Sequence, residues 1–123
     1  MCPTLSSGNI VIISRLTNNY ERFDIVIIEI PDTTIVKRII GMPGDTVHIR
    51  DGHVYINESM LNDVIDQYID FSGLATSRVK LGKDEYFVLG DNRTDSMDSR
   101  HIKVGVVKKK QIVGSVIFSF STL

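Results

Sequence analysis

The sequence contains one cysteine, three prolines and no tryptophan in 123 residues, and its formal net charge is −1. Cys2 alone cannot form an internal disulfide, and His48, His53 and His101 lack the spacing of a zinc site. The near-neutral charge excludes the basic surplus typical of nucleic-acid binders. No apolar run approaches the roughly 20 residues that span a bilayer, and no secretory signal segment is present. We therefore predict one soluble domain over residues 1–123, with no metal, cofactor or nucleic-acid partner.

Short blocks of β-branched residues, separated by turn residues, dominate the chain and predict strands. The expected strands are Asn9–Leu16, Phe23–Ile30, Thr34–Ile40, Thr46–Arg50, His53–Ile56, Glu85–Leu89 and Ile112–Phe120. Asp51-Gly52 is a two-residue hairpin signal, and around it Val47, Ile49, Val54 and Ile56 are spaced for one buried face. Only Asp63–Phe71 has a pattern compatible with a short helix. The spacing favours an all-β sandwich or barrel of antiparallel sheets.

The segment from Lys37 to Asp45 places a basic pair inside an apolar strand that runs directly into a turn. Lys37 and Arg38 must point to opposite faces of the strand, so one of them can face inward, beside Val36 and Ile39. A desolvated lysine with a lowered pKa is a usable general base. The competing interpretation is an edge-strand lysine whose ammonium reaches water.

A second polar segment, Gly90 to Arg100, follows the expected strand Glu85–Leu89 directly. Such a segment can be a solvated turn stabilised by its own Asx contacts. Asp98 and Arg100, however, are suited to form an ion pair, and Ser96 and Ser99 offer hydroxyls that could position a neighbour. The residues alone leave both interpretations open.

Together the two segments resemble the type I signal peptidases, the Ser/Lys endopeptidases of the bacterial membrane. The family's lysine motif resembles KRIIGMPGD at Lys37 to Asp45, and its GDNRxxSxDSR motif is matched at every fixed position from Gly90 to Arg100. Met1 to Leu5 resembles the end of its S-M-x-P-T-L nucleophile motif, Arg22 to Val26 its R-G-D-I-V stretch, and Gly105 to Phe118 its closing pattern. About 45 residues separate the two main motifs, which resembles the compact Gram-positive members.

The resemblance implies a role for each matching residue. Lys37 would be the general base, Ser96 would orient its amine, and Asp98 with Arg100 would form the ion pair that stabilises the loop. The remaining matches would be structural: Arg38, Gly41, Pro43, Gly44, Asp45, Gly90, Asp91, Asn92 and Arg93. No metal or cofactor is implied.

The resemblance also implies where the chain departs from the family. The family's nucleophilic serine stands immediately before the methionine that matches Met1, a position outside the 123 residues. We expect Ser6 and Ser7 not to replace it, Cys2 to be a small apolar filler, and the 123-residue chain to be inactive. Phe23 stands where the family prefers glycine, so the backbone there is expected to differ.

Three functions follow as hypotheses. The first is the extracytoplasmic domain of a membrane-bound signal peptidase that cleaves exported preproteins after small residues in an A-x-A pattern. The second is a non-catalytic module that binds pilin or sortase-pathway proteins in pilus assembly. The third, a self-cleaving cytoplasmic repressor, lacks the DNA-binding domain that it would need. The family's membrane helices would precede the nucleophile motif and are not in this sequence.

The partners implied are signal peptides, pilin subunits in the second hypothesis, and a lipid bilayer surface. We expect the A-x-A segment to add as a strand beside the one that carries Lys37, with pockets formed by Thr34, Ile35, Val36 and Ile39 and by residues flanking Met1. For the bilayer, Met1 to Leu5 are the preferred contact. Lys108 to Lys110 are more simply explained as a solvated turn than as a lipid contact.

Overall fold

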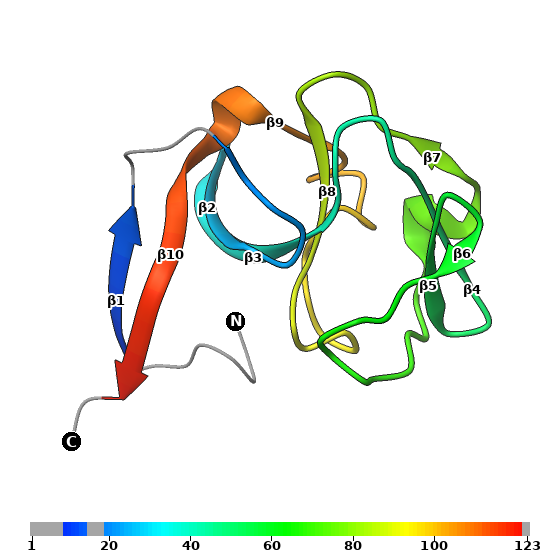
Figure 1. Cartoon of the computed structure of the whole chain (residues 1–123), viewed down its shortest axis with the longest axis horizontal. Coiled ribbons are helices and arrows are strands. Elements are labelled where there is room, and N and C mark those ends of the chain that lie inside the picture. The colour runs from blue at the N-terminus through cyan, green and yellow to red at the C-terminus, as the bar shows by residue number, and fades with distance from the viewer. Residues whose placement is uncertain (1–8, 15–18, 122–123) are drawn as a thin grey trace.

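The computed structural model describes the backbone of residues 9–14 and 19–121 and the side chains of residues 19–116. Within these residues ten strands form two antiparallel sheets, one ordered β1-β10-β2-β3-β8-β9 and one ordered β6-β5-β4-β7. In Figure 1 the first sheet extends from the left to the middle, where its strand β8 lies, and the second sheet lies on the right. The elements are β1 Asn9–Ser14, β2 Ile25–Ile30, β3 Thr33–Gly41, β4 Thr46–Arg50, β5 His53–Ile56, β6 Ser59–Met60, the 3-10 helix η1 Gly73–Thr76, β7 Val79–Lys80, β8 Glu85–Leu89, β9 Val107–Lys108, the 3-10 helix η2 Lys109–Gln111 and β10 Ile112–Ser121. The all-β fold expected from the sequence is confirmed.

The hairpin of β4 and β5 forms as the alternation predicted. Val47 pairs with Ile56 and Ile49 pairs with Val54, and all four side chains are buried. The connecting residues Asp51 and Gly52 have φ values of 51° and 79°, as a type I′ turn requires. Both features are local, because the period-two pattern selects the buried face and the turn sets the register.

The segment Asp63–Phe71, considered as a short helix, contains none, so that expectation was wrong. Its polar side chains make bonds that a helix would not: Asp63 Oδ1 accepts the Ile65 N–H two residues on, and Gln67 Oε1 accepts the backbone N–H of distant Arg93. Ile69 is the one buried apolar residue of the segment, and its N–H donates to Gly52 O. These bonds replace the helical ladder. The segment crosses from the second sheet to η1 as an irregular loop.

Two apolar cores lie on the two faces of β3 and β8. Ile39 and Val88, which pair across the strands, belong to the core with β2 and β10, whereas Ile40 and Leu89 belong to the core with β4 and β5. Because successive side chains of a strand point to opposite faces, each strand contributes to both cores. The ends of β3 and β8 are therefore held rigidly, and the two sequence motifs begin there.

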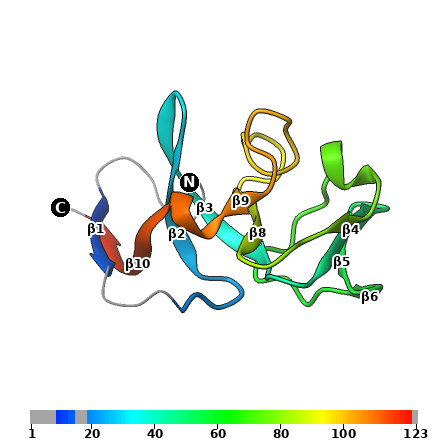
Figure 2. The ribbon, with the colours of Figure 1, turned by 90° about the horizontal axis from the view of Figure 1, so that it is seen from above.

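Strand β3 has two different surroundings along its length. Its whole length to Arg38 pairs with β2, but β8 pairs only with Arg38, Ile39 and Gly41, with a bulge at Ile40. Residues 33–37 thus have one neighbouring strand among the described residues, and Figure 2 shows the β2–β3 hairpin projecting away from β8. The Lys37 segment has an open edge directly beside the second motif.

Candidate active site

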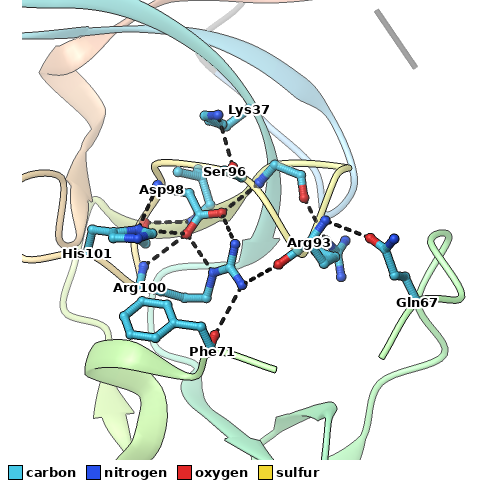
Figure 3. A network of polar contacts seen from close by, with 11 residues as sticks. Lys37, Gln67, Phe71, Arg93, Ser96, Asp98, Arg100 and His101 are labelled. Carbon is cyan, nitrogen blue, oxygen red and sulfur yellow. Dashed lines mark hydrogen bonds and ion pairs between the residues drawn. The ribbon is translucent and has the colours of Figure 1, made fainter. Parts of the chain in front are cut away.

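Lys37 and Ser96, 59 positions apart in the sequence, meet at the end of β3. Lys37 Nζ donates to Ser96 Oγ at 3.0 Å, and both side chains are half-buried (Figure 3). Burial lowers the pKa of Lys37, and the Arg100 guanidinium acts in the same direction, against the opposing effects of Asp98, Asp91 and Asp95. A larger fraction of this lysine is therefore neutral than of a lysine in water.

Asp98 lies on the other side of Ser96. Burial disfavours its charged form, but the hydrogen bonds and charge of Arg100 and the Gly90 N–H outweigh that effect and lower its pKa. The nearby Ser96 hydroxyl also contributes to the lowered pKa of Asp98. The Ser96 oxygen thus accepts the Lys37 N–H next to a buried carboxylate that stays charged.

The Asp98–Arg100 ion pair is buried on both sides. Arg100 Nε and Nη2 each donate to Asp98 at 2.8 Å, with side chains that are 1% and 0% exposed. The other arginine nitrogen, Nη1, donates to the carbonyls of Phe71 and Arg93, as Figure 3 shows. Each nitrogen of this guanidinium has a hydrogen-bond partner, as a buried charge requires.

Arg38 turns away from Lys37 and forms a second ion pair with the loop. Its Nε and Nη2 donate to the two Asp91 oxygens at 2.9 and 2.8 Å, and its Nη1 donates to the Phe23 carbonyl. Strand β2 begins at Ile25 and not at Phe23, because Phe23 adopts a φ of 77° in the left-handed region. Phe23 therefore adopts a conformation that glycine accommodates more readily than residues with a Cβ.

The turn after β3 is fixed by Asp45. Its Oδ2 accepts the Met42 N–H and Arg22 Nη1, and Pro43 followed by Gly44 at a φ of 88° fits a type II turn. Gly41 has a different reason to lack a side chain, because a Cβ there would lie 2.6 Å from the Val47 side chain.

The Gly90 backbone lies directly beside the Lys37–Ser96 pair. A Cβ on Gly90 would lie 1.9 Å from Ser96 Oγ and 3.3 Å from Lys37 Nζ. Both of its backbone groups are held: the N–H by Asp98 Oδ2 at 3.0 Å and the carbonyl by Arg93 Nε at 2.8 Å. The glycine allows Ser96 to reach the lysine, and the two bonds fix where it does so.

Sequence reasoning missed Asp63, which pairs with Arg93 through Oδ2 at 2.6 Å and Oδ1 at 3.2 Å. It lies in the loop first considered as a helix. A charge count could have suggested such a partner: Arg38 takes Asp91 and Arg100 takes Asp98, so the buried Arg93 still needs a carboxylate.

The expected substrate-contacting residues are not equally accessible. Thr34 is exposed and Ile35 and Val36 are half-buried, whereas Ile39 is fully buried in the core with β2 and β10. Asn92 is half-buried and accepts the Thr94 hydroxyl. Of the basic run, Lys108 ends β9 and pairs with Glu85, while Lys109 and Lys110 belong to η2. Met1 to Leu5, with Cys2, and Ser6 and Ser7 lie outside the described residues.

The site offers a partly neutral amine, a hydroxyl and an adjoining cavity of about 280 Å³, lined in part by Ser96, Phe71, Met97 and His101. Among residues 9–14 and 19–121, no cluster of His, Cys, Asp or Glu suited to a metal ion occurs. Nor does that part of the chain include a helix of the length and apolar character needed to cross a membrane. The chemistry supported here is proton transfer by Lys37.

Comparisons with known proteins agree with this geometry. The profile of the family described as "Signal peptidase, peptidase S26" matches residues 1–121. Signal peptidase I V of Bacillus subtilis (strain 168) is 34% identical over 132 residues, covering 94% of this chain and 77% of that protein. Signal peptidase I of Bacillus caldolyticus is 38% identical, covering 98% and 74%. The crystal structure of a signal peptidase I from Enterococcus faecalis V583 superposes with a TM-score of 0.60 at 32% identity, covering 79% of this chain and 96% of that one.

Proposed function

Since the chain belongs to the signal peptidase family S26, we propose that it is the catalytic domain of a Ser/Lys endopeptidase that removes signal peptides from exported preproteins. The observation that supports this proposal best is the half-buried Lys37 amine, 3.0 Å from Ser96 Oγ, with its pKa lowered by burial. A structural lysine needs a partner but not a lowered pKa, whereas a general base at neutral pH needs both.

In the proposed mechanism the nucleophile is a serine at the position before Met1. Neutral Lys37 takes the proton of that serine as its Oγ bonds to the scissile carbonyl carbon. The protonated amine then returns the proton to the leaving nitrogen as the C–N bond breaks. Water hydrolyses the acyl-serine in the same way, with Lys37 again as the base. Ser96 keeps the lysine lone pair aimed at the nucleophile by accepting one of the amine N–H groups.

The substrate would lie along the open edge of β3. Ile39 bonds to the β2 side through its N–H and carbonyl, so by alternation the backbone groups of Thr34 and Val36 face the side that β8 leaves open. An extended A-x-A segment can add there as a strand that ends beside Lys37. Ile35 and Val36, on opposite faces of the strand, would each border a shallow pocket that accepts only small side chains, and buried Ile39 lies on the face of Ile35.

We place this domain on the extracytoplasmic face of the cell membrane, next to the bilayer from which a signal peptide emerges. The family membership of relatives from Bacillus supports this location and the signal-peptide partner. Pilin subunits would be substrates or ligands only in the pilus-associated alternative.

The test is a chain with a serine added before Met1, incubated with a preprotein peptide that carries A-x-A, with products identified by mass spectrometry. We expect cleavage after the second alanine, and none by the 123 residues without the added serine. Lys37→Ala should lower turnover by at least about 10³-fold. Lys37→Arg should fail too, because guanidinium stays protonated. Lys83→Ala, at an exposed lysine, is the matched control.

Two outcomes would contradict the proposal. Turnover by the chain without the added serine, persisting after Ser6→Ala and Ser7→Ala, would place the nucleophile elsewhere. A serine-bearing chain that binds the peptide but leaves it intact would favour the non-catalytic module that binds pilin or sortase-pathway proteins.

A further inference from the structure

We propose that Asp63 is a positioning residue for the Lys37–Ser96 pair and acts on it through Arg93 and Gly90. The proposal rests on the proposed role of Lys37 as the general base. Asp63 lies outside both sequence motifs, in the irregular loop between β6 and η1.

The first step is the pairing of Asp63 with a fully buried charge. Arg93 has a side chain that is 0% exposed, and its Nη1 and Nη2 both donate to the Asp63 carboxylate, which is 15% exposed. Among the described residues, Asp63 is the one carboxylate with which this guanidinium pairs. A buried guanidinium without its counter-ion must move toward water or draw water in, so Asp63 determines where Arg93 stays.

The second step leads from Arg93 to the reacting groups. Arg93 Nε donates to the Gly90 carbonyl at 2.8 Å, and Gly90 lies so close to Ser96 and Lys37 that it has no space for a Cβ. A shift of Arg93 therefore shifts Gly90, and a shift of Gly90 moves Ser96 relative to Lys37. The Arg93 carbonyl also accepts Arg100 Nη1 at 2.8 Å, which links the same arginine to the Asp98 side of Ser96.

The loop holds Arg93 at a second point. Gln67 Oε1 accepts the Arg93 backbone N–H at 2.7 Å, as Figure 3 shows. Both the main chain and the side chain of Arg93 are thus held by residues 63–67. The segment that joins the second sheet to η1 therefore holds the turn from Gly90 to Arg93 in place.

Asp63 could act on Lys37 through its charge or by positioning its neighbours, and the two modes predict opposite changes in the pKa of Lys37 when Asp63 is removed. This difference makes the proposal testable. The charged groups with the largest effects on the pKa of Lys37 are Asp98, Arg100, Asp91 and Asp95, and neither Asp63 nor Arg93 is one of these four. If Asp63 acted directly by charge, its removal would leave Arg93 unpaired and lower the pKa of Lys37. If it acts by position, its removal loosens the site, admits water and raises the pKa of Lys37 toward its ordinary value.

The experiment is competitive acetylation of the full chain over a range of pH, with the Lys37 peptide quantified by mass spectrometry against the exposed Lys103. In Asp63→Ala we expect the labelling midpoint of Lys37 to rise by about one pH unit. Asp63→Glu should restore most of the original midpoint. Glu58→Ala is the matched control, because it also removes a carboxylate with two bonds to an arginine, but on the exposed surface.

The outcomes separate the two ideas. An unchanged midpoint together with a lower melting temperature would make Asp63 purely structural, and a lower midpoint would make its effect electrostatic; either overturns the proposal. If Asp63→Ala does not fold, Asp63→Asn and Gln67→Ala, which each keep part of the bonding, decide by the same measurement. The serine-bearing chain should also lose kcat with little change in KM. The labelling needs no cleavage, so it distinguishes a failure of this inference from a failure of the proposed function.

Discussion

Phe23 has a backbone conformation that residues other than glycine rarely adopt. Its φ is 77°, yet its N–H donates to Ile39 O at 2.7 Å and its carbonyl accepts Arg38 Nη1 at 2.9 Å. These bonds hold the entry to β2 against the end of β3. The aromatic ring packs against the core with β4 and β5, and that packing offsets a conformational cost of roughly 1–2 kcal/mol.

This balance gives a prediction about two substitutions at Phe23. Phe23→Ala loses the packing and keeps the strained φ, whereas Phe23→Gly loses the packing and relieves the strain. We expect the glycine variant to be more stable than the alanine variant by about 1 kcal/mol, as measured by urea unfolding. The reverse order would show that this backbone is not strained. Ser59→Gly and Ser59→Ala, at a described strand residue outside this turn, provide the ordinary comparison.

A second prediction at the residue scale separates the hydroxyl from the ion pair. Asp98→Ala leaves the buried Arg100 without its counter-ion and should cost about 3–5 kcal/mol of unfolding free energy. Ser96→Ala removes only a half-buried hydroxyl and should leave the melting temperature almost unchanged, while lowering turnover of the serine-bearing chain. Equal thermal losses in the two variants would mean that Ser96 serves the structure of the loop alone.

At the scale of the element, the open edge of β3 gives a prediction for solution NMR. A peptide with A-x-A should perturb the amide signals of Thr34 and Val36 more than that of Ile35, because the first two face the side without a strand. Residues 33–37 and 1–5 should contain the affected signals. Replacing either alanine of the peptide by phenylalanine should remove the effect. A response confined to Lys108 to Lys110 would contradict this mode of binding.

The elements that were predicted well are those whose signals are local. The β4–β5 hairpin follows from alternation and a two-residue turn, and the strand Glu85–Leu89 was placed with its observed bounds. The two-residue strands β6, β7 and β9 are too short to carry a pattern. The loop after β6 was considered as a helix from an ambiguous local pattern, but it forms none because its bonds go to Arg93 and Gly52, which are distant in the sequence.

The candidate site also has residues that local sequence signals identify and residues that only the folded chain reveals. The two motifs identified Lys37 and Ser96 as candidates, and the structure places them 3.0 Å apart. Asp63 could not be found by motif, since it depends on which carboxylate a folded chain brings to Arg93. Nor could the sequence show that β8 stops pairing at Arg38 and leaves the edge beside Lys37 open.

At the scale of the whole molecule, buried carboxylates predict how stability depends on pH. Hydrogen bonds and ion pairs outweigh burial and lower the pKa of both Asp98 and Asp45. The unfolded chain therefore binds more protons as the pH falls below about 4, and the folded state loses stability. The contribution is fully present above the unfolded pKa and is lost as the pH falls through the folded value.

Urea unfolding measured between about pH 6 and about pH 2 checks this expectation. Stability should decline toward low pH, and the decline should be smaller in Asp45→Asn and in Asp98→Asn, each compared with its own value at neutral pH. Asp66→Asn, at an exposed carboxylate, should leave the slope unchanged. A slope that both buried-site variants leave intact would assign the acid sensitivity to other groups.

Most positions of the loop from Gly90 to Arg100 are needed for the structure of the loop, whatever reaction the site performs. Asp91, Asp98 and Arg100 bond within the molecule, the Ser99 hydroxyl accepts the Val88 N–H, and Gly90 has no space for a side chain. Only Ser96 directly contacts the lysine through its hydroxyl. A descendant that stopped cleaving peptides would be free to change Lys37 and Ser96, but it would have to keep the other positions to remain folded. A pattern search with this loop therefore retrieves an architecture, and under the proposed mechanism enzyme and pseudoenzyme would be distinguished by Lys37, Ser96 and the residue before Met1.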